Sequence, residues 1–325
     1  MKRVLGLGNA LVDVLIRLQN DDILIQYELP RGSMILFPQD RAEELTASVS
    51  DMKREIASGG SAANTLHGLA RLGVETGFIG KTGKDEFGQV FENDLLKSGI
   101  ESRLLTGSAG TGRAIALISP DSERTFAVYL GSAIELVPED LESEVFSQYT
   151  HFHIEGYLVQ NHALIKRAVE LAKEKGLTVS LDLASFNVVK ENREFLLELT
   201  KNYVDILFAN EDEAYEFTLE KDPQKAASII GDLCPLAIVK IGSQGSYIRH
   251  NGNTIHIPAL KAECIDTTGA GDLFASGFMY GLSQNFSLEN CAKAGTILGG
   301  NIIGVIGAKI PESRWQELRN RIQSL

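Results

Sequence analysis

The stretch Asp266-Thr267-Thr268-Gly269-Ala270-Gly271-Asp272 leads directly into the apolar run Leu273-Phe274-Ala275-Ser276-Gly277-Phe278. This pattern predicts a tight glycine-rich turn that opens a buried helix. Glycine and alanine leave the backbone N–H groups of such a turn uncovered, and the positive end of the helix dipole lies at the same point. The turn can therefore form an anion hole, which suits a phosphoryl group in transfer.

Asp272 ends this turn, at the mouth of the predicted anion hole. A carboxylate there can accept the proton of an attacking hydroxyl group while a phosphoryl group moves across. The alternative is an ordinary helix start, in which the aspartate only compensates the helix dipole. The spacing by itself leaves both interpretations open.

Outward from this turn, apolar strand-like runs alternate with longer amphipathic segments, which predicts a parallel sheet covered by helices. Glycines that follow basic residues mark several helix ends, as at Gly73, Gly99 and Gly176. The expected strands are 4–7, 76–79, 150–154, 178–183 and 206–208, and the expected helices are 64–72, 87–96 and 163–175.

Two stretches interrupt this alternation. One spans residues 16–37, and the other, 113–130, has a hairpin pattern with a turn at 120–123. Strands that cannot join the main sheet in sequence order can form a small second sheet, which could close over a ligand cleft. We therefore expect a single domain over residues 1–325, with lid segments at approximately 16–37 and 113–130.

Composition narrows the class of protein. Of the 325 residues, 44% are hydrophobic and 23% are charged, which is typical of a folded globular protein. The formal net charge of −12 supplies no basic field, so nucleic acid is not an expected partner. The three cysteines have no C-x-x-C spacing, which favours a reducing cytoplasm over a disulfide framework or a zinc site.

No segment is expected to enter a membrane. The apolar stretch at the N-terminus is short and is interrupted by glycines, unlike the core of a signal peptide. We therefore expect the mature chain to start there. The longest mostly apolar run, 294–308, contains five glycines and is shorter than the roughly 20 residues that cross a bilayer. This run predicts a buried helix.

The segment Gly269-Ala270-Gly271-Asp272 closely resembles the C-terminal signature of the ribokinase-like, pfkB-type carbohydrate and nucleoside kinases. A second family signature has its counterpart in Gly59-Gly60-Ser61-Ala62-Ala63-Asn64. The resemblance, which extends over nearly the whole chain, implies an α/β fold: a Rossmann-like doubly wound sheet with helices on both faces and a small discontinuous β-sheet lid. It also implies ATP-dependent phosphorylation of a hydroxymethyl group, with Asp272 as the catalytic base and Gly269, Ala270 and Gly271 forming the anion hole.

The resemblance also implies an acceptor site. Gly59 and Gly60 would let the backbone approach the bound sugar, and the Asn64 amide would bond to its hydroxyls. Asn9 and Asp13 follow the first strand in a G-N-x-x-x-D arrangement, where a carboxylate suits a diol. Tyr157 belongs to the same expected site through the element Gly156-Tyr157-Leu158.

Weaker similarities concern the nucleotide and its ions. The motif at 210–213 resembles the N-x-x-E element that positions Mg²⁺, although it could equally be a solvated helix start. The strand and turn at 240–245 resemble those beside the nucleotide phosphates, although Lys240 could be only a strand-end charge. Asp266 falls where some family members bind a monovalent cation such as K⁺. The residues expected to bind ATP are Asn210, Lys240, Gly242, Gly245, Thr268 and Asn301, with Glu213 acting on Mg²⁺ through water. For Asn301, a core amide bonded to backbone is equally plausible.

Other motifs fit less well. The start at 6–11 resembles a dinucleotide fingerprint, but Leu11 is too bulky for its third glycine. Gly80-Lys81-Thr82 resembles the end of a Walker A loop, but Glu75 stands where that loop requires glycine. A catalytically silent sugar or nucleotide sensor would be expected to lack the base, and Asp272 is present.

Within the family, the adenosine kinase branch is the most similar, because of the sequence at 9–13, the long insertion before Gly59 and the segment at 204–211. Thr268 replaces the asparagine that eukaryotic adenosine kinases carry, and Arg113 is a second departure, placed where it could meet an anionic group of a substrate. A nucleoside of the adenosine type is thus the favoured acceptor, and a ribokinase- or fructokinase-like enzyme acting on a sugar or sugar acid is the alternative. We expect small-molecule partners and a monomer or homodimer.

Overall fold

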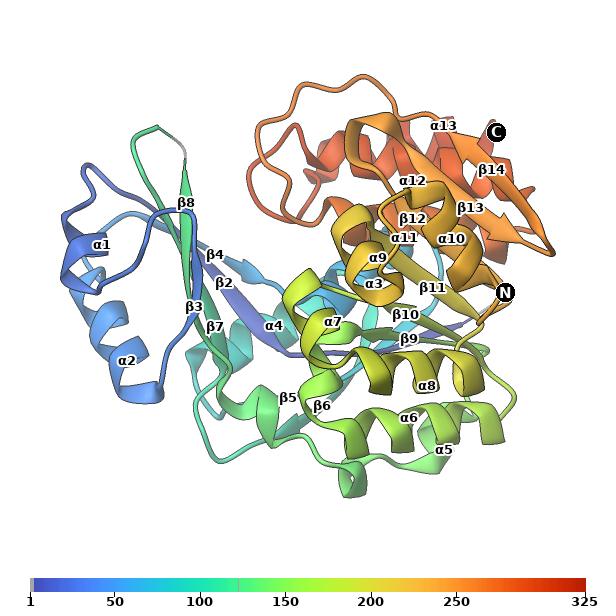
Figure 1. Ribbon diagram of the computed structural model, residues 1–325. Helices are drawn as coiled ribbons and strands as arrows, with labels where there is room; N and C mark the ends of the chain where they lie inside the picture. The colour runs from blue at the N-terminus through green and yellow to red at the C-terminus, as the bar shows by residue number, and fades with distance from the viewer. Residues whose placement is uncertain (1–2, 122) are drawn as a thin grey trace.

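The computed structural model describes residues 3–121 and 123–325, so Met1, Lys2 and Ser122, the last within the expected turn at 120–123, lie outside the described residues. These described residues form two sheets of unequal size (Figure 1). The order in the larger sheet is β14 (Asn253–Ile257), β13 (Ser246–His250), β12 (Leu236–Lys240), β11 (Ile206–Asn210), β10 (Thr178–Asp182), β9 (His151–Glu155), β1 (Val4–Leu7), β5 (Thr76–Thr82) and β6 (Ile100–Thr106).

The strands from β12 to β6 are parallel, and β13 and β14 add an antiparallel edge. Both faces of this sheet are buried. In β1, Val4 packs into one hydrophobic core while Leu5 and Leu7 pack into the other. The first core includes α3 (Ser61–Arg71), α4 (Glu86–Lys97), α11 (Ala270–Ser283), α12 (Leu288–Ile302) and α13 (Trp315–Gln323).

The second core lies against the opposite face, and its helices are α5 (Ser143–Phe146), α6 (His162–Glu174), α7 (Phe186–Glu191), α8 (Arg193–Tyr203), α9 (Glu211–Thr218) and α10 (Pro223–Gly231). Helices therefore cover both faces, which confirms the expected doubly wound α/β architecture. Among the described residues, no helix combines the length and the apolar character needed to span a bilayer.

The smaller sheet stands to one side of the larger, with two short helices packed beside it (Figure 1). Its order is β3 (Met34–Leu36), β8 (Arg124–Tyr129), β7 (Gly112–Ile118), β2 (Leu11–Arg17) and β4 (Arg54–Ser58), and the helices are α1 (Asp22–Gln26) and α2 (Gln39–Ser48). β7 and β8 pair antiparallel, as the hairpin pattern predicted, whereas β4 was not foreseen. Alternate residues of β2 are buried in the core, so Leu11 and Asp13 lie on its opposite face, where both line a cleft.

Two expected helices have different bounds. α3 begins at Ser61 rather than Asn64, directly after Gly60, whose φ of +87° breaks the helical backbone. The apolar run 294–308 is helical only to Ile302, and the chain turns farther on at Gly307, whose φ is +84°. The Gly307 N–H donates to the Asp266 carboxylate, which ties this loop to the glycine-rich turn before α11.

Candidate active site

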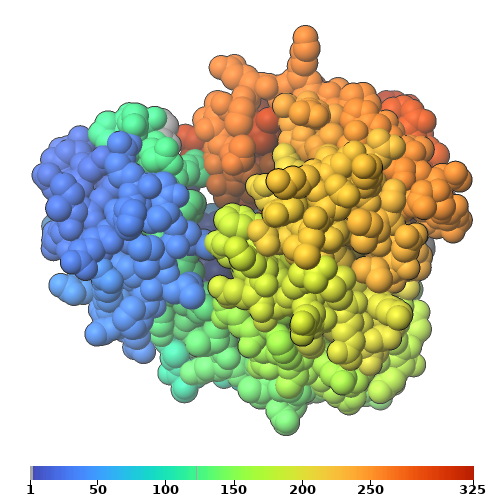
Figure 2. Space-filling model, in the orientation of Figure 1, coloured from blue at the N-terminus to red at the C-terminus, as the bar shows by residue number. Residues whose placement is uncertain are grey.

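A cleft of about 1150 Å³ lies between the two sheets, and the space-filling view shows it as a hollow beside the small sheet (Figure 2). Its floor is at the carboxyl ends of parallel strands in the larger sheet, since Glu155 ends β9, Asp182 ends β10 and Lys240 ends β12. β1 lies between β5 and β9, so the order of strands reverses there. Open α/β sheets bind ligands at such a switch point.

The glycine-rich turn projects into this cleft at the start of α11. Gly269 precedes the helix with a φ of +75°, a left-handed conformation that glycine adopts without strain. A Cβ atom at Gly269 would lie only 2.8 Å from the Ala308 Cβ, and one at Gly271 would lie 3.1 Å from the Lys240 Nζ. Because the first N–H groups of a helix lack intrahelical partners, this narrow turn can receive an anion.

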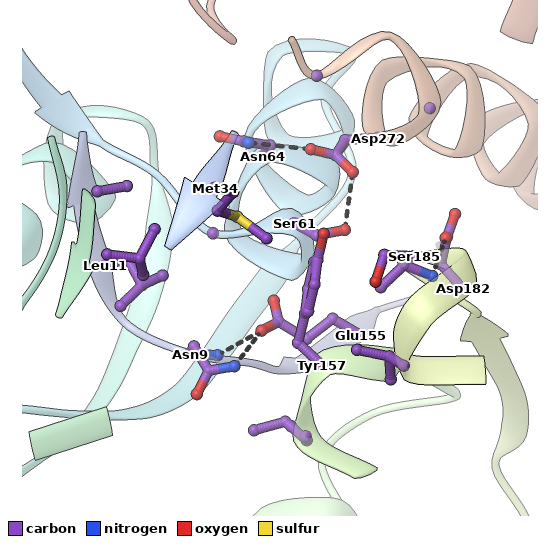
Figure 3. Close-up of a pocket in the computed structure, with 18 of the residues that line it drawn as sticks. Asn9, Leu11, Met34, Ser61, Asn64, Glu155, Tyr157, Asp182, Ser185 and Asp272 are labelled. Atoms are coloured by element: carbon purple, nitrogen blue, oxygen red, sulfur yellow. Dashed lines mark hydrogen bonds between the residues drawn. The ribbon is translucent and has the colours of Figure 1, made fainter. Parts of the chain in front are cut away.

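Asp272 lies in the first turn of α11, and α3 supplies its partners (Figure 3). The Ser61 hydroxyl donates to Oδ1 at 2.7 Å, and the Asn64 amide donates to Oδ2 at 2.9 Å. Burial raises the pKa of Asp272 to about 6, although both hydrogen bonds act in the opposite direction. A carboxylate with this pKa is ionised at neutral pH and can accept a proton.

Glu155 organises the floor of the cleft. Its carboxylate accepts the Asn9 backbone N–H at 2.8 Å and the Asn9 side-chain amide at 2.7 Å (Figure 3). It also accepts the Ala62 N–H at 2.9 Å. It thereby joins the ends of β9 and β1 to the start of α3. A Cβ atom at Gly8 would lie 2.5 Å from its Oε2, which explains why this position must be small. Burial raises the pKa of Glu155 to about 7.

Asp13 lines the cleft from β2, next to the backbone of Gly59. A Cβ atom at Gly59 would lie 2.2 Å from the Asp13 Oδ1, so only glycine leaves space for the carboxylate. Burial raises the pKa of Asp13 to about 7, while Lys309 acts against this shift. Tyr157, in the short helical turn after β9, rises from the floor toward Ser61 (Figure 3), and burial raises the pKa of its phenol.

A second polar group lies farther along the same strand ends. The Asn210 and Glu213 side chains form a reciprocal cap at the start of α9, with the Asn210 N–H and amide donating to the Glu213 carboxylate at 2.8 Å each. Lys240 forms a 2.9 Å ion pair with Asp182. Burial raises the pKa of Glu213 to about 7. Burial by itself would lower the pKa of Lys240. The negative charges of Asp182 and Glu213 have the larger combined effect, so the pKa of the lysine is raised.

Both carboxylate oxygens of Asp266, just before the glycine-rich turn, accept hydrogen bonds. Its Oδ1 accepts the Thr268 N–H at 3.0 Å and the Thr268 hydroxyl at 2.8 Å, and its Oδ2 accepts the Gly307 N–H. Arg124, from strand β8 of the small sheet, forms a 2.7 Å ion pair with the same Oδ2 and donates to the Thr268 hydroxyl at 2.9 Å. The guanidinium thus supplies a positive charge to this carboxylate from the small sheet.

The cleft brings together most of the side chains that the sequence singled out, and it leaves a few outside its lining. Those in the lining are Asn9, Asp13, Gly60, Asn64, Tyr157, Asn210, Glu213, Lys240, Gly242, Thr268, Gly269, Ala270, Gly271 and Asp272. Gly59 lies behind Asp13, and Asp266 lies behind Thr268. A Cβ atom at Gly245 would lie 1.9 Å from the Ile257 carbonyl oxygen, which gives this glycine a role in the β12–β13 turn. The Asn301 amide donates to the Ile297 carbonyl.

Arg113 does not meet the cleft. Its guanidinium lies over the rings of Phe87 and Tyr129, at 5.2 and 5.3 Å from their centroids, and burial lowers its pKa. The expected contact with an anionic group of a substrate is therefore not supported by this arrangement.

Five residues in or near the site were not predicted from the sequence: Ser61, Glu155, Asp182, Arg124 and Lys309. A usable signal existed for Glu155 and Asp182, because each is a charged residue that ends an apolar strand of a parallel sheet, where ligand-binding residues gather. Ser61 stands inside the quoted Gly59–Asn64 segment. Arg124 and Lys309 have no local signal, since their partners lie more than one hundred residues away in the chain.

Comparisons with known proteins agree with this fold. A solved structure of a probable sugar kinase from Rhizobium etli is 34% identical, with a TM-score of 0.89, and the match covers 100% of this chain and 99% of that chain. The adenosine kinase from Sinorhizobium meliloti is also 34% identical, with a TM-score of 0.88 and coverage of 98% and 99%. The aminoimidazole riboside kinase of Salmonella typhimurium is 27% identical over 76% of this chain and 81% of its own. The model of the pfkB family carbohydrate kinases matches residues 32–315. The chain therefore belongs to the pfkB family of carbohydrate kinases and is an ATP-dependent kinase.

Proposed function

We propose that this kinase transfers the γ-phosphoryl group of ATP to the 5′-hydroxyl group of a purine nucleoside, with adenosine as the first candidate. The observation that carries the proposal is an apolar wall opposite the polar floor of the cleft. Met34 and Leu36 of β3 are 57% and 56% exposed, although both line the cleft. Phe126 and Val128 of β8 continue the same wall.

This wall favours a nucleoside over a free sugar. A sugar presents hydroxyl groups on all sides, and each one placed against apolar side chains loses its hydrogen bonds to water. A purine base instead presents flat apolar faces, which pack on aromatic and aliphatic side chains. The similarity to the adenosine kinase of Sinorhizobium meliloti supports the same acceptor class.

The polar floor would bind the ribose. Asn9, Asp13 and Asn64 offer amide and carboxylate groups to its hydroxyls, Gly59 and Gly60 let the backbone approach, and Tyr157 forms the adjoining wall. The 5′-hydroxyl would then lie near Asp272, which takes its proton as the oxygen attacks phosphorus. The N–H groups around Gly269, Ala270 and Gly271 would stabilise the charge on the transferred group.

The nucleotide would occupy the other end of the cleft. We assign the lining residues Asn210, Lys240, Gly242 and Thr268 to ATP. Gly245 and Asn301 lie outside the lining and would act on this end of the cleft by shaping the β12–β13 turn and the end of α12. Glu213 would act on Mg²⁺ through water, and the buried acidic cap that it forms with Asn210 is a suitable environment for this. When bound, Mg²⁺ neutralises phosphate charge. A K⁺ ion at Asp266 would have to displace the Arg124 guanidinium.

The small sheet would serve as a lid for this reaction. Its segments, approximately 16–37 and 113–130 within a single domain of residues 1–325, carry the apolar wall and Arg124. Closure would exclude water that could otherwise accept the phosphoryl group. We further propose a cytoplasmic enzyme that is a monomer or a homodimer and acts on small molecules alone.

The alternative is a kinase of free sugars or sugar acids, in line with the ribokinase of Haemophilus influenzae, which is 28% identical over 74% of this chain. We expect kcat/KM for adenosine to exceed that for ribose or fructose by about 10–100-fold under saturating MgATP, because base stacking contributes about 1–3 kcal/mol. The Asp272→Asn variant should lose about 10²–10⁴-fold in kcat while still binding ATP. A higher kcat/KM for either free sugar would replace the nucleoside with a sugar as the acceptor.

A further inference from the structure

Lys309 lies in the loop between α12 and α13, outside the lining of the main cleft. Its ammonium group donates to the Ser58 hydroxyl at 2.6 Å and forms an ion pair with Asp94 of α4. The side chains of Lys309 and Asp94 are only 22% and 29% exposed. An ion pair this well covered is screened less than a surface pair, so its geometry matters more.

The loop that carries Lys309 also contacts the glycine-rich turn. The Gly307 N–H donates to Asp266, and a Cβ atom at Gly269 would press against Ala308. These consecutive residues thus connect three elements: the anion-hole turn, the end of β4 at Ser58, and helix α4 through Asp94.

The end of β4 in turn forms the support of Asp13. In the β2–β4 register, Asp13 pairs with Ala57 and Val12 pairs with Ser58, and the Gly59 N–H donates to the Leu11 carbonyl at 2.8 Å. The Asp13 carboxylate lies against Gly59, the residue directly after Ser58. Asp13 faces the main cleft, whereas Lys309 and Asp94 line a separate small cleft of about 240 Å³ beneath β4.

We propose that Lys309 is a positioning residue for the acceptor: it fixes the Ser58–Gly59 corner and supplies the positive charge that faces Asp13 from the side away from the acceptor. This role rests on the proposed function of Asp13 in binding acceptor hydroxyls. A buried carboxylate binds a diol best when it is ionised, and a nearby cation favours the ionised form.

The charges around Asp13 agree with this arrangement. Burial raises its pKa to about 7, Lys309 is the strongest group acting against that shift, and Arg124 of β8 acts in the same direction as Lys309. The negative charges of Asp272 and Asp266 raise the pKa of Asp13, as burial does. Burial lowers the pKa of Lys309 to about 8, Arg71 acts in the same direction, and Asp13 opposes both. Asp13 and Lys309 therefore each stabilise the charge of the other. Near neutral pH, acceptor binding therefore depends on Lys309 remaining charged and in place.

The test compares Lys309→Met with Asp94→Asn, because the two changes have opposite electrostatic effects. Lys309→Met removes the cation, so the pKa of Asp13 should rise by about one unit. Asp94→Asn leaves the cation but removes the charge that partly neutralises it, so the pKa of Asp13 should fall. A purely structural contribution of this ion pair would move both variants in the same direction.

Two readouts apply. The first is the titration of the Asp13 carboxyl carbon by ¹³C NMR in the whole protein without acceptor, assigned with Asp13→Asn. The second is the pH dependence of acceptor KM and kcat: Lys309→Met should raise KM by about 3–10-fold at pH 7, with a smaller effect at pH 9 and little change in kcat. Lys309→Arg should restore the wild-type profile. Lys97→Met is the matched control, since Lys97 lines the same small cleft and is exposed.

The proposal is overturned if the Asp13 titration in Lys309→Met matches wild type, or if both main variants shift it in the same direction. If Lys309→Met does not fold, two results still test the proposal. The pKa of Asp13 must fall in Asp94→Asn, and Lys309→Arg must keep the wild-type pH dependence of acceptor KM. The NMR titration needs no acceptor. A wild-type enzyme that phosphorylates neither nucleosides nor sugars would instead overturn the proposed function, whatever the titration shows.

Discussion

Removing the Ser61 hydroxyl should change the protonation of Asp272 through a single contact. In Ser61→Ala, the carboxylate loses the 2.7 Å hydrogen bond to Oδ1 and keeps the 2.9 Å bond from Asn64 to Oδ2. That hydroxyl lowers the pKa of Asp272, which burial has raised to about 6. A hydrogen bond to a charged group contributes about 1.5–3 kcal/mol, and one pKa unit corresponds to about 1.4 kcal/mol. We therefore expect the pKa to rise by at least about one unit.

The consequence for the rate depends on pH. If Asp272 must be ionised to accept a proton, a rise from about 6 to about 7 lowers kcat by about tenfold at pH 5 and by only about 10% at pH 8. A coupled assay of ADP release between pH 5 and 9, at saturating acceptor and MgATP, measures this profile. The acidic limb should move to higher pH, while the plateau at high pH stays close to that of wild type.

Thr65→Val provides the matched control. The Thr65 hydroxyl lies in the same helix and bonds to Asp272, but it donates to the backbone carbonyl at 3.3 Å rather than to the carboxylate. Its removal should leave the acidic limb in place. The reasoning is refuted if Ser61→Ala lowers kcat equally at all pH values, or if Thr65→Val moves the limb as far as Ser61→Ala does.

Two further predictions concern the lid and the buried carboxyls. Acceptor binding should slow hydrogen exchange in segments 16–37 and 113–130, because closure shields their amides; exchange unchanged at saturation would argue against closure. Burial raises the pKa values of Asp13, Glu155 and Glu213 to about 7, so the folded state takes up protons between pH 8 and 6.5 that the unfolded state does not. The free energy of unfolding of the ligand-free protein should therefore increase by about 2 kcal/mol as pH falls from 8 to 6.5, raising Tm by about 2–4 °C. His67 and His153 offset part of this gain, because burial lowers their pKa values and the unfolded state binds protons at both of them near pH 6.5. A Tm that falls as the pH is lowered from 8 to 6.5 would contradict the prediction.

Local sequence signals were sufficient for the framework of the fold. The alternation of apolar strands and amphipathic segments predicted helices on both faces of a parallel sheet, because burial on both faces requires continuous apolar runs. The hairpin at 113–130 was equally visible, from its two apolar runs and the turn residues between them. Strand β4 was missed, since Arg54 and Glu55 are exposed and give it no apolar pattern. Helix α12 ended at Ile302, earlier than the apolar composition of 294–308 indicated, and the chain turns beyond it at Gly307.

The sequence by itself also predicted the chemistry proposed for the glycine-rich turn, because the proposed anion hole and Asp272 come from consecutive residues whose backbone geometry is local. Only the tertiary structure decided which groups surround that aspartate. Ser61 and Asn64 reach it across more than two hundred residues, Arg124 reaches Asp266 from the other sheet, and Lys309 joins β4 to α4. Charges and hydrogen bonds act through space over a few ångströms, and sequence separation contains no information about such distances. The pKa values of the buried carboxyls follow from that three-dimensional arrangement alone.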